Sequence, residues 1–141
     1  MTQEKTGRDC PEGKAKVAVS KRAHPVHPVV RLIAENLAGV NAIRTVKVTP
    51  GFLRASSETC GAWGNPQPGH PTAVGISLIL DEERKEIQFF EIMSAVKGYG
   101  SRMVKAVMDA LPEEWRAYVL MDWSGGFWDV MRKRHRRLTL L

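Results

Sequence analysis

The sequence has few cysteines and few aromatic residues, and it has no long apolar run. Of its 141 residues only Cys10 and Cys60 are cysteines, and neither has a second cysteine at the spacing of a metal site. A disulfide between them is disfavoured in a reducing compartment. No apolar run reaches the roughly 18 residues that a membrane span needs. The N-terminal residues also lack the hydrophobic core of a signal peptide. We therefore expect a cytoplasmic protein with no membrane partner.

Positive charge is in excess, with a formal net charge of +6. Such a bias favours nucleic acid, an acidic substrate or a polyanionic cofactor as a partner. Five cations crowd near the C-terminus, where they are typical of a solvated helix end. A nucleic-acid patch is the alternative, although no aromatic pattern for base stacking accompanies it. The five are Arg132, Lys133, Arg134, Arg136 and Arg137.

The chain divides into a tail and one domain. Residues 1–26 are polar, basic and poor in large apolar side chains, which predicts a mobile tail. Residues 27–141 are long enough to build a single domain with its own core. His24 and His27 stand three apart at the boundary and could bind a metal ion. The prolines beside them favour an extended connector instead, so we expect no metal site.

Hydrophobic periodicity predicts a mixed order of helices and strands. The helix expected over 101–111 has its apolar residues on one face, at Met103, Val104, Val107, Met108 and Leu111. A last short helix is expected to bury Phe127, Val130 and Met131. Strands 73–80 and 86–93 flank a turn at 81–85 and should pair antiparallel. The other expected elements are a helix at 29–40, a strand at 45–48, a long loop at 55–72, a strand at 116–123 and an edge strand at 138–141.

A glycine turn joins the strand that ends at Met93 to the helix that begins near Ser101. Gly98 and Gly100 stand in this turn. A helix N-terminus offers unpaired N–H groups and partial positive charge, and glycine lets a ligand approach the backbone closely. This pattern predicts a phosphate site. A P-loop motif is absent, and Met103 stands where a dinucleotide-binding fingerprint needs its third glycine.

The run Val96-Lys97-Gly98-Tyr99-Gly100-Ser101 and the amphipathic helix after it resemble the acetyl-CoA loop of the GNAT superfamily of N-acetyltransferases. The loop is most similar to that of the histone acetyltransferase branch. The resemblance implies an α/β fold with a mixed, mostly antiparallel central sheet and helices on both sides. It also implies that the strands at 87–93 and 117–123 splay apart, so that the pantetheine arm of acetyl-CoA enters between them.

The resemblance implies transfer of an acetyl group from acetyl-CoA to a primary amine, by direct attack in a ternary complex. Backbone N–H groups from about Lys97 to Arg102 would hold the pyrophosphate, and the two cations would add positive charge. Ser101 is expected to cap the helix, and Tyr99 to pack. By analogy with the family, Met93, Ser94 and Val96 would contact the pantetheine. The predicted cofactor-binding residues are Met93, Ser94, Val96, Lys97, Gly98, Tyr99, Gly100, Ser101 and Arg102.

Two carboxylates are candidates for the base that deprotonates the amine. Glu91 stands between Phe90 and Ile92 in a strand expected to be buried, where apolar surroundings raise the pKa of a carboxyl group. The run Phe90-Glu91-Ile92 also resembles the strand that bears the catalytic glutamate of the histone acetyltransferase branch. Glu86 fits the usual distance to the loop better, and it starts the strand. We predict Glu91 as the base, with Glu86 as the reserve.

The sequence departs from the family pattern at two places. Ala95 stands where many members have Gln or Arg, and the last helix offers Trp128 and Met131 where many have a proton-donating tyrosine. A catalytically degenerate module that binds acyl-CoA therefore stays open, as does a basic nucleic-acid-binding protein. The acceptor is an amine-bearing small molecule, a protein lysine or an N-terminus, and a homodimer is also left open.

Overall fold

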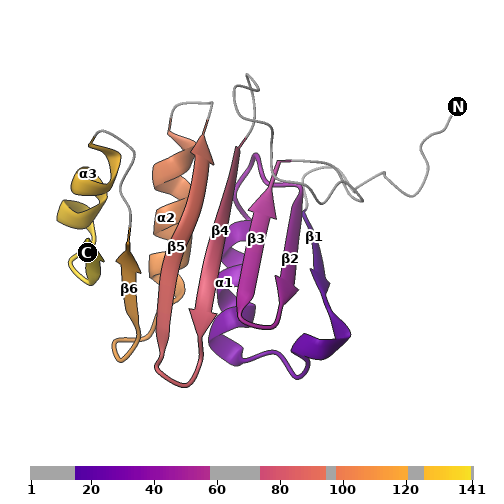
Figure 1. Cartoon of the computed structure of the whole chain (residues 1–141). Coiled ribbons are helices and arrows are strands. Elements are labelled where there is room, and N and C mark those ends of the chain that lie inside the picture. Colours follow the sequence, from indigo (N-terminus) through magenta and orange to yellow (C-terminus); the bar gives the residue numbers. More distant parts are fainter. Residues whose placement is uncertain (1–14, 58–73, 95–97, 121–125, 141) are drawn as a thin grey trace, which may run out of the picture.

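The computed structural model describes residues 15–57, 74–94, 98–120 and 126–140 of the chain. Over these ranges one mixed sheet is covered by helices (Figure 1). The elements in chain order are β1 (Lys16–Val19), a short 3-10 helix η2 (Lys21–Ala23), α1 (Pro28–Ala38), β2 (Thr45–Thr49), β3 (Phe52–Ser56), β4 (Val74–Asp81), β5 (Glu86–Ser94), α2 (Tyr99–Ala110), β6 (Arg116–Val119), α3 (Phe127–Arg134) and β7 (Leu138–Leu140).

The sheet has seven strands in the described ranges, and their spatial order is their order in the sequence. The pairs β2–β3, β3–β4 and β4–β5 are antiparallel, whereas β1–β2, β5–β6 and β6–β7 are parallel. Each parallel pair is connected through a helix, as such pairs require. The predicted mixed α/β architecture is thus confirmed. Three of the six strand pairs are antiparallel and three are parallel, and the two longest strands, β4 and β5, form an antiparallel pair.

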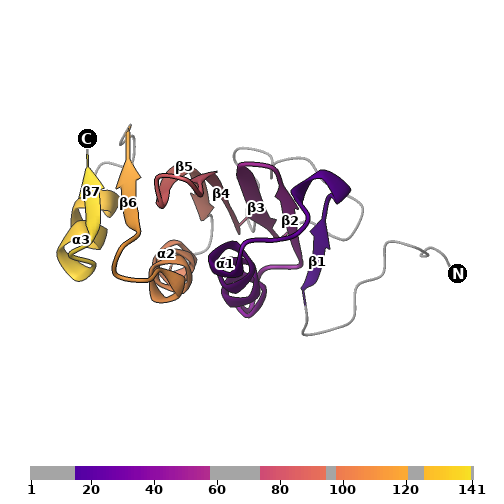
Figure 2. The same cartoon turned by 90° about the horizontal axis from the view of Figure 1, so that it is seen from below.

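The helices lie on one face of the sheet rather than on both. Contacts between the helices place them on the same side: Asn36 of α1 bonds to Ala106 of α2, and the ring of Phe127 in α3 lies against Gly100 of α2. Figure 2 shows the three helices below the sheet. Trp128 of α3 accordingly reaches Phe89 of β5, with 5.0 Å between ring centroids. The expectation of helices on both sides was therefore wrong for the described residues.

The core lies between this helical layer and the sheet. All five residues of the predicted apolar face of the helix at 101–111 are buried, so that part of the prediction is confirmed. The side-chain amide of Asn36 in α1 donates a hydrogen bond of 3.0 Å to the carbonyl oxygen of Ala106 in α2. This bond fixes the two helices side by side over the central strands, and so positions the N-terminus of α2.

Two strands were missed by the sequence prediction. Residues 15–26 were expected to be part of a mobile tail, but β1 pairs in parallel with β2 and η2 follows it. Strand β3 was partly assigned to the long loop at 55–72, yet it pairs with both β2 and β4. Both strands are short, and each pairs with a strand that is distant in sequence, β1 with β2 and β3 with β4.

The C-terminal elements occur in the predicted order, but one residue of α3 that was expected in the core faces the solvent. Strand β6 ends at Val119, whereas it was expected to run to residue 123. Residues 121–123 of the expected strand lie outside the described ranges. Helix α3 buries Trp128 and Met131, whereas Val130 is 44% exposed. The expectation that Val130 is buried was thus wrong, because the helix turns its tryptophan toward the core instead. The edge strand predicted at 138–141 is confirmed as β7.

Candidate functional site

The glycine turn lies between the C-terminal end of β5 and the first turn of α2. Gly98 is the N-cap of α2 and has a left-handed backbone with φ of 95°. Its carbonyl oxygen accepts the N–H of Arg102 at 3.3 Å and the hydroxyl of Ser101 at 3.2 Å. Ser101 was expected to cap the helix, but it stands three residues inside it and donates its hydroxyl hydrogen back. Val96 and Lys97, which the sequence places in the site, lie outside the described residues.

Ser94 contributes the side-chain acceptor that the N-cap lacks. Its Oγ atom accepts a hydrogen bond of 3.1 Å from the backbone N–H of Gly100. The N–H groups of Tyr99 and Ser101 have no acceptor among the described residues. Unpaired amides in a first helical turn carry partial positive charge. The N–H groups of Tyr99 and Ser101 are therefore available to a ligand, whereas the N–H group of Gly100 is bonded to Ser94.

The two glycines are required for different reasons. A β-carbon on Gly98 would meet no atom within 4 Å, and glycine is favoured there by the positive φ. A β-carbon on Gly100 would lie 3.0 Å from Cε1 of Phe127 and 3.6 Å from the β-carbon of Ser94. Gly100 is therefore required by close packing against α3 and β5. The space beside Gly98 is open, and a ligand can approach the backbone from that side.

Positive charge is held next to this open space. The exposed guanidinium of Arg102 lies over the ring of Tyr99, with 5.0 Å from Cζ to the ring centroid. The hydroxyl oxygen of Tyr99 accepts a hydrogen bond of 3.3 Å from the side chain of Asn41. Tyr99 thus packs, as the sequence predicts, and it holds Arg102 close to the N-terminus of α2. The arrangement combines amide donors and a fixed cation, which together suit a phosphate group.

Strand β5 presents an unpaired edge beside the same turn. Strand β6 pairs with β5 at only three positions, the last of which joins Gln88 to Tyr118. Strand β5 continues to Ser94, so its residues 89–93 have no strand partner on that edge in the described part of the chain. Backbone N–H and C=O groups on an open edge are ready to pair with an extended molecule. The end of β5 and the start of α2 lie at the same end of the sheet (Figure 1).

The two candidate bases occupy different ends of β5. In the strand register Glu86 lies opposite Asp81 of β4 and opposite Arg116 of β6. These positions are at the end of β5 away from the glycine turn. Glu91 lies three residues before the strand ends at Ser94. Its side chain is exposed, so the expected burial of Glu91 was wrong. The position along β5 favours Glu91 over Glu86, because Glu91 is nearer the turn.

A β-bulge, which the sequence prediction missed, explains why Glu91 is exposed. Leu78 of β4 pairs with Phe89, but its neighbour Ser77 pairs with Glu91, which leaves Phe90 as an extra residue in β5. The extra residue reverses the face on which the following side chains lie. The broken alternation in Phe89-Phe90-Glu91 was the available signal. Bulges are over-represented next to active sites, which agrees with a site at this end of β5.

His27, one of the two histidines near the start of the domain, has a structural role. The Nδ1 atom of His27 accepts the backbone N–H of Val29 at 3.1 Å and thereby caps α1. Its ring also packs edge-on against Trp115, with 5.4 Å between centroids. No group of three or more metal-ligating side chains occurs among the described residues. The absence of a metal site at His24 and His27 stays a prediction, whereas His27 has a direct role as the N-cap of α1.

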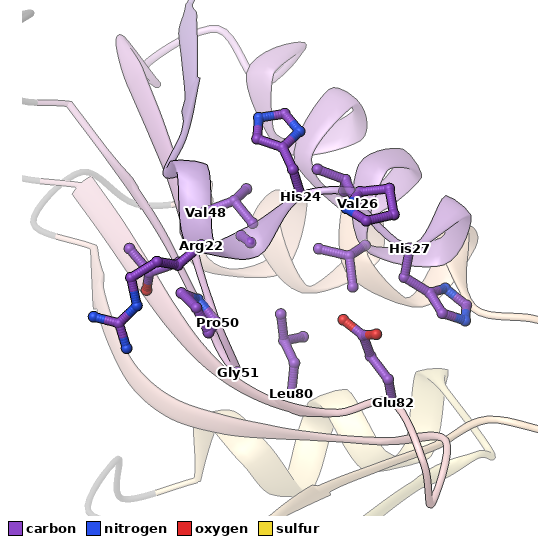
Figure 3. Close-up of a pocket in the computed structure, with 13 residues that line it drawn as sticks. Arg22, His24, Val26, His27, Val48, Pro50, Gly51, Leu80 and Glu82 are labelled. Atoms are coloured by element: carbon purple, nitrogen blue, oxygen red, sulfur yellow. The ribbon is translucent and has the colours of Figure 1, made fainter.

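A cavity of about 280 Å³ lies at the end of the sheet away from the glycine turn (Figure 3). The turns β2–β3 and β4–β5 contribute to its wall, and the side chain of Glu82 stands at its rim. Arg22, His24 and His27 add further polar groups to its lining. The cavity is therefore separate from the junction of β5 and α2. Among the residues that line it are Val26, His27, Val48, Pro50, Leu80 and Glu82.

Several C-terminal cations have partners within the protein. Arg132 and Lys133 both pair with Asp129, at 3.0 Å and 3.4 Å, and these ion pairs lower the pKa of the exposed Asp129 carboxyl group. Arg137 donates to carbonyl oxygens at the end of α2, namely Leu111 at 2.8 Å and Met108 at 3.2 Å. The cluster thus neutralises an acid and caps a helix, which supports the helix-end interpretation over a nucleic-acid patch.

Comparison of the chain with family models, with curated proteins and with solved structures found no match. No helix in the described ranges is both long enough and apolar enough to cross a membrane. The junction of β5 and α2 is the strongest candidate site, because it combines amide donors, a cation and an open strand edge.

Proposed function

We propose that the protein is an acetyl-CoA-dependent N-acetyltransferase of the GNAT type. The observation that supports this most is the continuity between the open edge of β5 and the N-terminus of α2. A molecule with an extended amide-bearing arm and a phosphorylated end fits these two features in the same order. Acetyl-CoA has this construction, since its pantetheine arm ends in a pyrophosphate.

The phosphate end would bind at the first turn of α2. The amides of Tyr99 and Ser101 point from the helix N-terminus, and the open side of Gly98 lets an anion approach them. Arg102 supplies a full positive charge beside the amides. Backbone donors bind a phosphate without side-chain specificity, and the cation adds a charge-assisted bond. This geometry supports pyrophosphate binding at the turn.

The pantetheine arm would add a strand-like partner to the open edge of β5. Its two amide groups can exchange hydrogen bonds with the backbone between Phe89 and Ser94. Pairing of this kind places the thioester further down β5, away from the phosphates. The bulge at Phe90 lies along this path. The reacting carbonyl is therefore expected near Phe90 and Glu91.

The chemistry is attack of a neutral amine on the thioester carbonyl. An ammonium group must first lose a proton, and Glu91 accepts it directly or through a water molecule; such a base typically contributes about 10²–10⁴-fold. The amine nitrogen then bonds to the carbonyl carbon, and the tetrahedral intermediate expels the thiolate of coenzyme A. The nitrogen loses its second proton as the amide forms, and a water molecule passes this proton to the thiolate, because the described residues of α3 include no tyrosine. Glu86 remains the reserve for the base.

A module that binds acyl-CoA without catalysis is the second candidate. The observation that favours it is the residue set of α3, where Trp128 and Met131 are buried and neither is an acid. Such a module would bind acetyl-CoA at the same turn and would release no thiol. The two functions are separated by measuring cofactor binding and thiol release on the same sample.

Calorimetric titration with acetyl-CoA tests the proposal. Arg102→Glu should weaken binding by at least tenfold, because it replaces a cation beside the phosphates with an anion. Arg84→Glu is the matched control, since Arg84 is an exposed cation in the β4–β5 turn at the far end of β5. Equal binding by both variants would reject the phosphate site. Binding without thiol release from a panel of amines would leave only the non-catalytic module.

A further inference from the structure

The bulge in β5 places two neighbouring side chains on the same face of the sheet. In a regular strand Phe90 and Glu91 would point to opposite faces. Here Glu91 pairs with Ser77, so the side chain of Glu91 projects from the same face as that of Ser77, the face that has no described helix. Phe90 projects from that face as well, because its ring lies edge-on against Phe52 with 6.4 Å between centroids. A carboxylate and an aromatic ring therefore lie side by side.

The rings of Phe52 and Phe90 form an exposed aromatic surface. Phe90 is 55% exposed, which is unusual for a phenylalanine in a central strand. Phe52 pairs with Ile79, which is 37% exposed on the same face. Large exposed apolar side chains that gather at one place mark a binding surface more often than single ones do.

The carboxylate beside these rings has no charged partner in the part of the chain that the structure describes. Glu91 has no ion pair among the described residues, although cations outnumber acids in the chain. The nearby guanidinium of Arg54 instead lies 5.4 Å from the centre of the Phe52 ring and donates to Ser77 at 3.4 Å. Glu91 is therefore available to a cation that comes from outside the protein.

We propose that Phe52, Phe90 and Glu91 form the acceptor site, and that the acceptor is a monoamine with an aromatic body. The carboxylate of Glu91 binds the ammonium group, and the rings contact the apolar body. Arg54 lies beside Ser77 in the same row of the sheet as Glu91, so a second positive charge there is disfavoured, which selects against polyamines. This inference rests on the proposed function, because it names the substrate class of the same site.

Direct binding of model amines to the full chain tests this site. The probes are 2-phenylethylamine, its neutral isostere 2-phenylethanol and the polyamine spermidine, each followed by backbone amide shifts in ¹H–¹⁵N spectra. We expect 2-phenylethylamine to shift amides of β3 and β5 and to bind about tenfold more tightly than either other probe, because only it satisfies both the carboxylate and the rings. Equal binding of all three would overturn the proposal.

Two variants assign the contacts. Glu91→Gln keeps the shape of the side chain and should weaken 2-phenylethylamine binding by about tenfold while leaving 2-phenylethanol unchanged. Phe90→Leu should weaken both, and its exposed position makes loss of folding no concern. The matched controls are Glu83→Gln in the β4–β5 turn and Leu32→Ala, an exposed apolar residue of α1. No effect of Glu91→Gln would reject the site.

A parallel acetyl-CoA titration separates this inference from the proposed function. If acetyl-CoA binds and 2-phenylethylamine does not, the acceptor assignment is wrong and the cofactor site stands. If the amine binds at β3 and β5 and acetyl-CoA does not bind, the amine site stands and the acetyltransferase is wrong. Binding of both, with loss of only the amine in Glu91→Gln, supports the inference as stated.

Discussion

The ring of Phe127 lies directly against Gly100, so that a β-carbon on residue 100 would be only 3.0 Å from Cε1 of the ring. Phe127 is the first residue of α3, and Gly100 stands in the first turn of α2. One aromatic contact therefore sets the position of the turn whose amides are proposed to hold phosphate. The glycine at this position is explained by packing, and the glycine at 98 by backbone conformation.

Gly100→Ala is expected to lower the free energy of unfolding by about 1–3 kcal/mol, because the added methyl group overpacks against the ring of Phe127. Combining it with Phe127→Ala should make the two effects non-additive, since the ring that causes the clash is removed. Urea unfolding measures both. Gly39→Ala is the control, because Gly39 has helical dihedrals and an added β-carbon there would lie no closer than 3.4 Å to another atom. Strict additivity of the double variant would contradict this explanation.

Ser94→Ala should destabilise the protein by about 1 kcal/mol, the usual cost of losing a side-chain acceptor at a helix N-terminus. The Oγ atom of Ser94 is the acceptor for the N–H of Gly100. Ser101→Ala is the matched control, since the carbonyl of Gly98 that Ser101 contacts still accepts the N–H of Arg102. In thermal unfolding, Ser94→Ala should have a lower melting temperature than Ser101→Ala. The reverse order would show that Ser94 does not cap α2.

Arg137→Ala is expected to cost about 1–3 kcal/mol, because carbonyl oxygens at the end of α2 lose their donor. The guanidinium donates to Met108 and Leu111. Arg137→Lys should recover part of the loss, since a lysine keeps the charge but not the forked geometry. Arg136→Ala, at an exposed neighbouring position, should change stability little. Denaturant midpoints compare the three, and equal effects at 136 and 137 would contradict the capping role.

His135 predicts a pH dependence of stability. Burial lowers the pKa of His135 below its ordinary value of 6.5; Arg134 and Lys105 act in the same direction, and Asp109 opposes them. The folded state thus binds the proton less readily than the unfolded state. Stability is complete above about pH 6.5 and falls as the pH drops from there through the lowered pKa. Urea unfolding between pH 7.5 and pH 5 should show a flatter profile for His135→Gln than for the unsubstituted protein. Parallel profiles would contradict the assigned pKa direction.

The sequence predicted the parts of the fold that local patterns determine. The apolar stripe of α2 and the β4–β5 hairpin have strong periodicity and clear turn residues, and both were found where expected. Strand β1 lies in a polar, basic stretch and is held by pairing with β2, so no local pattern revealed it. Strand β3 was missed for a related reason, because the residues after it are rich in Gly, Pro and Ser.

The candidate site was predicted less completely than the fold. Gly98 and Gly100 were identified, but a single sequence cannot show that one is needed for its positive φ and the other for contact with Phe127. The exposure of Glu91 depends on the pairing register of β4 and β5, which shifts by one residue at Phe90. Register is a long-range property, since a slip of one residue exchanges the two faces of a strand.

The most direct test of the account is a ¹H–¹⁵N titration of the chain with acetyl-CoA. We expect the largest shift changes at the amides of Tyr99 and Ser101, with smaller changes along β5 from Phe89 to Ser94. These groups are the donors and the open edge to which the cofactor is assigned. Saturating acetyl-CoA that leaves these amides unchanged, or that shifts only residues around the cavity of Figure 3, would contradict the proposed cofactor site.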